Sequence, residues 1–334
     1  MTDAPSAQRE PGMPTFEYVE TNGIKLKTYT AGPDDGFPIV LCHGWPEMAY
    51  SWRHQIKALA EAGLKVIAPN MRGYDGSPGP DEVEAYDMEH LTADLVGLLD
   101  HYGYEKAVFV GHDWGGFITW QMPLRHADRT AGVIGLNTPF IPRLSDDPIK
   151  LFTMGYGEKF YIIRMQEPGK IDALLNNNVE RFFKMVMRRS DVTPEEFNAR
   201  PAEERDFDLF RPLELPESED VNWTGTGFLS DEEMQVFVEA YKRSGSTGGI
   251  NWYRNFTRNW ERSADQVDKV DCPCLMIGAA RDVVLPPSLM DGMEKYVPNL
   301  TKHVVEDSGH WTQQEQPEEV NEVMIDWLNK RFWT

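Results

Sequence analysis

Short apolar runs alternate with helical stripes of apolar residues along this sequence, and this alternation restricts the fold more than any other feature. The runs 37–42, 64–68 and 107–110 are almost entirely apolar, which is typical of strands buried on both faces. Between them, as in 91–102, apolar residues recur at helical spacing. Buried strands that alternate with amphipathic helices form parallel sheets. The sequence therefore predicts an α/β fold with a mostly parallel sheet flanked by helices.

The alternation is interrupted once. It stops near Pro139 and resumes with the apolar run 272–278. The stretch between them is rich in Met, Phe, Tyr, Arg and acidic residues and contains no run typical of a buried strand, so we expect a helical cap (lid) inserted into the α/β core. The expected division places the first part of the core at 1–138, the cap at 139–260 and the second part of the core at 261–334.

Composition limits the partners and the compartment. The chain has 334 residues, and 33 Lys and Arg against 54 Asp and Glu give a net charge of −21. This charge repels nucleic acids and anionic membranes, and 41% hydrophobic residues exclude global disorder. No apolar run approaches the roughly 18 residues of a membrane span, residues 1–12 lack the apolar centre of a signal peptide, and the three cysteines form no zinc or redox spacing. We expect a cytoplasmic protein without a membrane span or nucleic-acid partner, and self-association stays open.

The sharpest local motif is GHDWGG at 111–116, between a predicted strand and a predicted helix. Glycines two positions before and after a central residue permit a strained strand-to-helix turn that presents the central side chain above the sheet edge, the nucleophile elbow. The central residue is Asp113 rather than serine. An acidic helix N-cap after a glycine turn is the simpler interpretation. We favour the elbow because its usual partners follow along the chain.

Asp282 and His310 follow Asp113 in the order nucleophile, acid, histidine. Asp282 comes just after the predicted strand 274–278, and His310 comes just after a strand predicted to end near Glu306. Taken singly, a turn aspartate or a core histidine is the commoner explanation. Both lie at carboxyl ends of strands, where open α/β sheets bind ligands. We therefore predict that Asp282 orients His310 and that His310 acts as a general base.

An aspartate in this elbow selects alkyl transfer at saturated carbon. A serine that displaced a leaving group from such a carbon would be left as a stable ether. Asp113 would instead be left as an ester, whose carbonyl carbon water can attack. His310 would deprotonate that water and so restore the carboxylate.

Hydrolysis of that ester passes through an oxyanion, which needs hydrogen-bond donors. The segment HGWPE at 43–47 follows a predicted strand, as an oxyanion loop does, and a plain strand-to-helix loop is the alternative. We predict that the backbone N–H groups of Trp45 and Trp114 are the two donors.

These motifs resemble those of the epoxide hydrolases of the α/β-hydrolase fold, the family that includes the C-terminal domain of mammalian soluble epoxide hydrolase. The resemblance runs over almost the whole chain, and its most specific parts are YIIRMQEPG at 161–169 and NWYRN at 251–255. It implies a small-molecule epoxide as substrate, no cofactor and no metal, with Tyr161 and Tyr253 hydrogen-bonding the epoxide oxygen to assist ring opening. The substrate site that we expect comprises His43, Pro46, Trp114, Tyr161 and Tyr253.

Tyrosines suit ring opening for a physical reason. An epoxide opens to an alkoxide, which leaves only when it receives a proton or hydrogen bonds, and a phenol with a pKa of about 10 supplies these while staying protonated at neutral pH. Buried cap aromatics without chemistry are the simpler alternative. A haloalkane dehalogenase of the same fold is a second candidate function, although dehalogenases typically carry Asn where Trp45 stands. A non-catalytic relative that binds a small apolar ligand is the third.

Three features depart from the family pattern. In the loop NMRGYDGS at 70–77, Asn70 replaces the usual acid and Asp75 precedes the glycine. Arg164 stands in the first cap motif, where an apolar tunnel is expected, and the charged segment 191–219 aligns with no family segment. The roles of Arg164 and of 191–219 stay open at this level.

Overall fold

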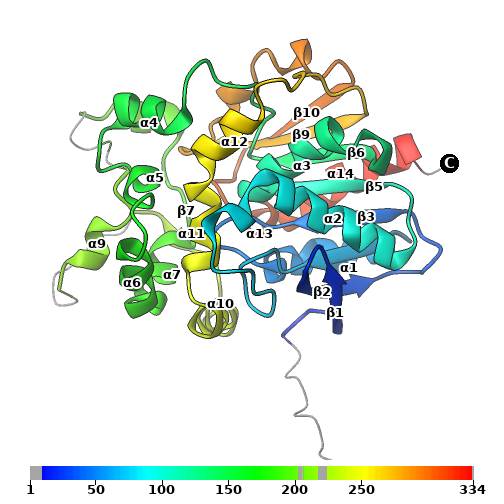
Figure 1. Ribbon diagram of the computed structural model, residues 1–334, viewed down its shortest axis with the longest axis horizontal. Coiled ribbons are helices and arrows are strands. Elements are labelled where there is room, and N and C mark those ends of the chain that lie inside the picture. The colour runs from blue at the N-terminus through cyan, green and yellow to red at the C-terminus, as the bar shows by residue number, and fades with distance from the viewer. Residues whose placement is uncertain (1–9, 202–204, 206, 217–223, 333–334) are drawn as a thin grey trace, which may run out of the picture.

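The computed structural model describes residues 10–201, 205, 207–216 and 224–332, and its centre is an eight-stranded sheet in the order β1-β2-β4-β3-β5-β6-β9-β10 (Figure 1). The pairs β1–β2 and β2–β4 are antiparallel, and all other neighbours are parallel. The predicted fold class is therefore confirmed. The strands are β1 (Phe16–Thr21), β2 (Ile24–Ala31), β3 (Pro38–Cys42), β4 (Lys65–Pro69), β5 (Ala107–His112), β6 (Thr130–Leu136), β9 (Cys274–Ala279) and β10 (Leu300–Val305).

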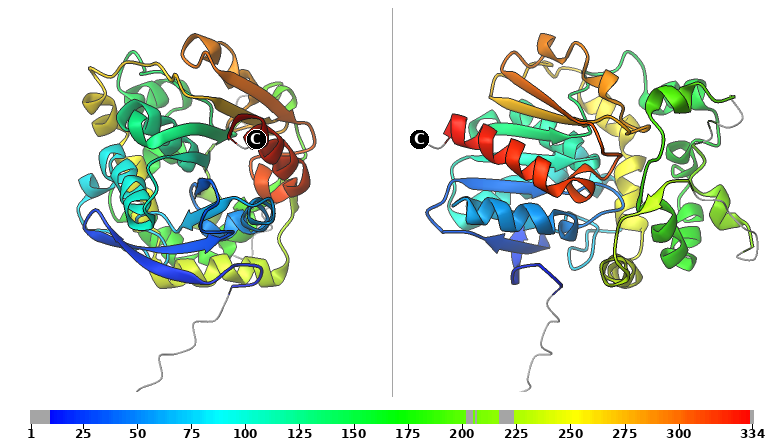
Figure 2. Two further views of the ribbon diagram at one scale, coloured as in Figure 1. Left: turned by 90° about the vertical axis from the view of Figure 1, so that its right-hand side faces the viewer. Right: turned by 180° about the vertical axis from the view of Figure 1, so that it is seen from behind.

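Helices cover both faces of the sheet. On one face α1 (Arg53–Glu61) packs against α14 (Pro317–Phe332), and on the other α2 (Met88–Tyr102) packs against α3 (Trp114–Arg125) (Figure 2). Every residue of β3, β4 and β5 is buried between them, which explains why these strands are continuous apolar runs rather than alternating ones. Within the described residues, no helix combines the length and the apolar character needed to cross a membrane.

The chain between β6 and β9 forms a helical cap beside the core (Figures 1 and 2). Its helices are α4 (Pro148–Tyr156), α5 (Tyr161–Arg164), α6 (Lys170–Asn177), α7 (Val179–Val186), α8 (Pro194–Asn198), α9 (Arg211–Glu214), α10 (Asp231–Ser244), α11 (Thr247–Arg254) and α12 (Phe256–Arg262), with a short ribbon of β7 (Arg188–Arg189) and β8 (Thr226–Gly227). The segment 191–219 contains α8 and α9, and its residues 202–204, 206 and 217–219 lie outside the described residues. The exact division of the chain at residues 138 and 260 stays a prediction.

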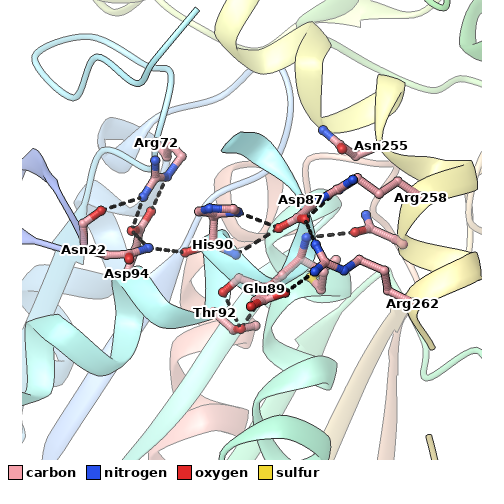
Figure 3. A network of polar contacts seen from close by, with 12 residues as sticks. Asn22, Arg72, Asp87, Glu89, His90, Thr92, Asp94, Asn255, Arg258 and Arg262 are labelled. Carbon is pink, nitrogen blue, oxygen red and sulfur yellow. Dashed lines mark hydrogen bonds and ion pairs between the residues drawn. The ribbon is translucent and has the colours of Figure 1, made fainter. Parts of the chain in front are cut away.

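Asp87 joins the cap to the core (Figure 3). It is the N-cap of α2, and its buried carboxylate accepts hydrogen bonds from the backbone and ring of His90 and from Arg258 and Arg262 of α12 at 2.9 and 3.0 Å. Burial alone would raise the pKa of this carboxyl, but the hydrogen bonds from Arg258 and His90 outweigh burial and lower it to about 2. The charge on Asp87 therefore holds α12 against the start of α2.

A second ion pair, between Arg72 and Asp94, fastens the loop after β4 to α2 (Figure 3). Arg72 donates through Nε and Nη2 to the two carboxylate oxygens of Asp94 at 2.8 and 2.6 Å, and Asn22 donates to the same carboxylate at 3.0 Å. The indole N–H of Trp252 in α11 donates to the carbonyl of Arg72 at 3.1 Å. The loop after β4 in the core is thus hydrogen-bonded directly to α11 of the cap.

Asp87→Asn is expected to lower the free energy of unfolding by about 2–3 kcal/mol at neutral pH, because two arginines then face an uncharged amide. A carboxyl with a depressed pKa contributes stability above its unfolded pKa of about 3.9 and loses it as the pH falls through the folded value. The difference between variant and wild type in urea unfolding should therefore shrink as the pH falls toward about 2. Asp271→Asn, which removes an exposed carboxylate paired with Lys269, is the control and should cost about 0.5 kcal/mol or less. Equal losses in the two variants would contradict the role given to Asp87.

Candidate active site

Asp113 stands at the turn between β5 and α3. Its backbone has φ 53° and ψ −121°, a conformation that costs free energy in a residue other than glycine. The surroundings permit only glycine on either side: a Cβ at Gly111 would lie 2.1 Å from the carbonyl oxygen of Gly115, and one at Gly115 would lie 2.0 Å from that of Cys42. The Thr138 hydroxyl donates to the carbonyl of Asp113 at 2.7 Å. The motif therefore forms a strained turn, which a hydrogen bond from the loop after β6 stabilises.

The loop after β3 reaches the carboxylate of Asp113. The backbone N–H of Trp45 donates to Asp113 Oδ1 at 2.8 Å. This approach requires Gly44, because a Cβ there would lie 2.4 Å from the Cβ of Asp113. The N–H of Trp114 belongs to the first turn of α3, where a helix leaves N–H groups without intrahelical partners. Both predicted donors thus adjoin Asp113.

His310 lies between Asp113 and Asp282. Its Nε2 is 3.6 Å from Asp113 Oδ2, and its Nδ1 is 2.9 Å from Asp282 Oδ2. The other oxygen of Asp282 accepts hydrogen bonds from the backbone N–H groups of Val284 and Leu285 at 2.9 and 3.0 Å. Asp282 and His310 follow β9 and β10, so the carboxyl ends of parallel strands bring together three residues that are far apart in sequence.

The charges of this triad are coupled. Burial alone would raise the pKa of Asp282, but the charge of His310 and its hydrogen bond outweigh burial and lower it to about 2. Burial alone would lower the pKa of His310, but the charge of Asp282 and hydrogen bonds to Asp113 and Asp282 raise it well above its ordinary value. Two carboxylates therefore favour a proton on His310 until one of them loses its charge.

Tyr161 in α5 and Tyr253 in α11 form the cap side of the site. Their ring centroids are 5.9 Å apart, and both rings contact Trp45. Burial, together with the negative charge of Asp113, raises the pKa of both phenols. Their hydroxyls therefore keep their protons at neutral pH and can donate them in hydrogen bonds.

A cavity of about 490 Å³ lies between the cap and the carboxyl ends of the strands. Its wall contains seven of the predicted site residues, namely Trp45, Pro46, Asp113, Tyr161, Tyr253, Asp282 and His310. Beyond them the wall is largely apolar, with Met185, Val186, Phe207, Leu209, Pro212, Val283, Val284 and Trp311, and arginines and other polar residues complete it. The structure thus brings the predicted nucleophile, base, acid and tyrosines to one largely apolar cavity.

Two predicted substrate contacts lie outside this wall. His43 has no exposed surface, and its Nε2 accepts a hydrogen bond from the N–H of Met71 at 2.9 Å. The expected contact of His43 with substrate is therefore wrong: the imidazole serves to hold two loops together. The ring of Trp114 packs behind Tyr253, with centroids 5.1 Å apart, and its backbone rather than its ring adjoins Asp113.

Asn137 is a site residue that the sequence reasoning missed. It follows β6, has a φ of 60°, and donates through Nδ2 to Asp282 Oδ2 at 2.8 Å. This is the oxygen that faces His310, so Asn137 helps to hold Asp282 in register. Its place directly after a buried strand, at the same sheet edge as the triad, is the signal that could have revealed it.

A buried network behind the base was also missed. His112 contacts Glu47 Oε2 through Nδ1 at 2.7 Å and the carbonyl oxygen of His310 through Nε2 at 2.6 Å. Both partners offer oxygen acceptors. For both contacts to be hydrogen bonds, His112 and Glu47 together must hold one proton more than a neutral imidazole and a carboxylate do. Gln313 and Gln314 donate to the other oxygen of Glu47 at 2.9 and 3.0 Å. The carbonyl of His310 is therefore anchored to a fully buried polar network.

Arg164 does not line the cavity, although its partner Asp208 does. Its guanidinium pairs with Asp208, which precedes α9, and with Glu214, the last residue of α9. It also stacks over the ring of Phe210. The structure therefore resolves the question that the sequence left open: Arg164 ties α5 to the α9 region of the cap.

Comparison with known proteins supports the same class. Residues 38–162 match a family model described as alpha/beta hydrolase fold. The chain is 42% identical to Epoxide hydrolase A of Mycobacterium tuberculosis over 333 residues, which cover 95% of this chain and 98% of that protein. It is 40% identical to Bifunctional epoxide hydrolase 2 of Mus musculus, over 92% of this chain and 54% of the mouse protein.

Solved structures agree. The crystal structure of Epoxide Hydrolase A from Mycobacterium thermoresistibile is 40% identical and superimposes with a TM-score of 0.81, covering 95% of this chain and 98% of that one. The sheet and the strand-to-helix turn at Asp113 are those of an α/β hydrolase. Within that class, the identity and the coverage show that the chain belongs to the epoxide hydrolase family.

Proposed function

We propose that the protein converts an epoxide and water to a vicinal diol through a covalent ester on Asp113. In the first step Asp113 Oδ2 attacks an epoxide carbon, the carbon–oxygen bond of the ring breaks, and the oxygen takes a proton from Tyr161 or Tyr253. Oδ1 stays hydrogen-bonded to the Trp45 N–H at 2.8 Å, which leaves Oδ2 as the attacking atom. The raised pKa of both phenols supports donation of a hydrogen bond before the proton moves.

In the second step water attacks the carbonyl carbon of the ester and passes its proton to His310. The ester carbonyl oxygen becomes the oxyanion, where the Trp45 N–H stabilises it. Collapse breaks the Cγ–Oδ2 bond of Asp113, and Oδ2, now bonded to the substrate carbon, takes the proton from His310 and leaves as the second hydroxyl of the diol. The restored carboxyl of Asp113 carries the other proton of the water, and this proton passes to the tyrosinate that the first step left. Esterification removes the charge of Asp113 that helps to raise the pKa of His310, so the imidazole gives up its proton more readily and its neutral form is available to take a proton from water.

The observation that carries this proposal is the pair of cap tyrosines in the same cavity as Asp113 and His310. A carboxylate nucleophile favours attack on saturated carbon, and the phenols supply the proton that an epoxide oxygen needs and a halide does not. An epoxide is therefore the substrate that uses all of the predicted groups.

Incubation with styrene oxide and, separately, with a 1-haloalkane tests the proposal. We expect diol from the epoxide and little halide from the haloalkane. In a single turnover in ¹⁸O-labelled water, the first diol should be unlabelled, because its new oxygen comes from Asp113, while the label enters the carboxylate. Halide without diol would favour a dehalogenase, and label in the first diol would exclude the covalent route.

A further inference from the structure

Glu315 binds the backbone N–H groups of the two residues that flank His310. Its carboxylate accepts a hydrogen bond from the N–H of Gly309 at 2.8 Å through Oε2 and from the N–H of Trp311 at 3.0 Å through Oε1. The side chain has no exposed surface. A buried carboxylate is costly unless it is hydrogen-bonded and paired, so this arrangement is a specific one that neither epoxide ring opening nor the triad itself requires.

The geometry restricts the placement of the imidazole. The two N–H groups belong to the residues on either side of His310. The carbonyl of His310, at the other end of the peptide group that carries the Trp311 N–H, contacts the His112 ring at 2.6 Å. With both flanking amides and the carbonyl fixed, the backbone at His310 cannot rotate without breaking buried hydrogen bonds. These hydrogen bonds then set the position of His310 Nε2, which lies 3.6 Å from Asp113 Oδ2.

The cap supplies the counter-charge of Glu315. Arg189 in β7 lies with its Nε 3.4 Å from Glu315 Oε2, and its Nη2 donates to the backbone carbonyl of Glu315 at 3.0 Å. The same stretch of the cap touches the loop twice more: the Trp311 indole donates to the carbonyl of Val186 at 2.9 Å, and a Cβ at Gly309 would lie 3.1 Å from the N of Ser190. Cap residues 186–190 therefore lie directly on the loop that carries His310.

We propose that Glu315 and Arg189 are positioning residues that tie the catalytic base to the cap, so that hydrolysis of the covalent ester requires cap residues 186–190 to be in place. The inference rests on the two-step function proposed above. Ring opening uses the Asp113 carboxylate and the cap phenols, and none of these groups bonds to Glu315. The hydrolytic step alone depends on where His310 Nε2 holds water. Water therefore attacks the ester only while the cap covers it.

The test is the division of the effect between the two chemical steps. In Glu315→Gln the amide nitrogen cannot accept a hydrogen bond, so one of the two flanking N–H groups loses its partner. Misplacing a catalytic group by about 1 Å costs up to about hundredfold in rate. We expect ester hydrolysis to slow by about ten- to hundredfold while ring opening stays within about twofold of wild type. With styrene oxide, kcat and KM should then fall together, kcat/KM should hardly change, and mass spectrometry after acid quench should show accumulated ester on Asp113.

Arg189→Met gives a second route to the same answer, because it removes the counter-charge and the hydrogen bond to the Glu315 carbonyl while every residue of the His310 loop stays unchanged. We expect a smaller fall in kcat with the same unchanged kcat/KM, and partial recovery in Arg189→Lys, which keeps the charge. Arg243→Met is the matched control: Arg243 also joins the cap to the core, through Asp75 at 3.0 Å, but it does not touch the His310 loop. Its kinetics should equal those of wild type.

Several results would overturn the inference. Equal losses in kcat and kcat/KM, or normal hydrolysis in both Glu315→Gln and Arg189→Met, would show that neither residue positions the base. If Glu315→Gln fails to fold, as judged by circular dichroism, Arg189→Met decides. Failure of the proposed function is distinguishable, because wild type itself would then yield no ester on Asp113.

Discussion

His310→Gln is expected to open one epoxide ring per molecule and then stop. Asp113 and the tyrosines remain in place, so the ester forms, but no group at the position of Nε2 can take the proton of water. Loss of a general base typically costs between about 10² and 10⁴ in rate, and we expect kcat for diol to fall toward the upper end of this range. Rapid quench with styrene oxide should show a protein adduct that approaches one equivalent, whereas the rate of adduct formation should stay near that of wild type.

His303→Gln is the control for this experiment. His303 lies in β10, the strand that leads to the His310 loop, and its ring pairs with Glu319 at 2.7 Å. It does not line the cavity. Its substitution should leave both steps unchanged. Loss of adduct formation in His310→Gln, in step with the loss of diol, would contradict the assignment of His310 to the second step.

Replacing both Tyr161 and Tyr253 with Phe is expected to abolish ring opening, the first of the two chemical steps. Without either phenol, the ring oxygen must leave as a bare alkoxide in a buried site, where an unpaired charge is most costly. We expect kcat/KM to fall by on the order of 10³–10⁴ and no ester to accumulate on Asp113. Each single variant should lose less, because the remaining hydroxyl still reaches the same cavity.

Tyr156→Phe is the matched control, because Tyr156 lies in α4 of the cap, is 57% exposed and does not line the cavity. Its kinetics should be unchanged, and the thermal midpoint of the double variant should stay close to that of wild type. Retained ring opening in the double variant would remove the role proposed for the tyrosines. The double variant and His310→Gln thus fail on different sides of the ester, which a single adduct measurement separates.

Local patterns explain why much of this protein could be predicted. The continuous apolar strands follow from burial on both faces of a parallel sheet, and the elbow follows from glycines that must stand beside a strained Asp113. Both leave a local pattern in the sequence, although the contact that requires Gly115 is with distant Cys42. The same reasoning was wrong for His43, because a histidine after a strand has the same sequence signal whether it faces a ligand or, as here, accepts the N–H of Met71 inside the core.

By itself, then, the sequence determined the fold class and predicted the order of nucleophile, acid and histidine, since short-range periodicity and motif spacing encode these. The tyrosines of the cap motifs were implied by the resemblance to the epoxide hydrolases. Only the tertiary structure decided which polar groups support the acid and the histidine. Asn137 meets Asp282 across 145 residues, and Arg189 meets Glu315 across 126. Such pairs arise where the cap folds back over the sheet edge, and no local pattern records which buried acceptor a distant donor will reach.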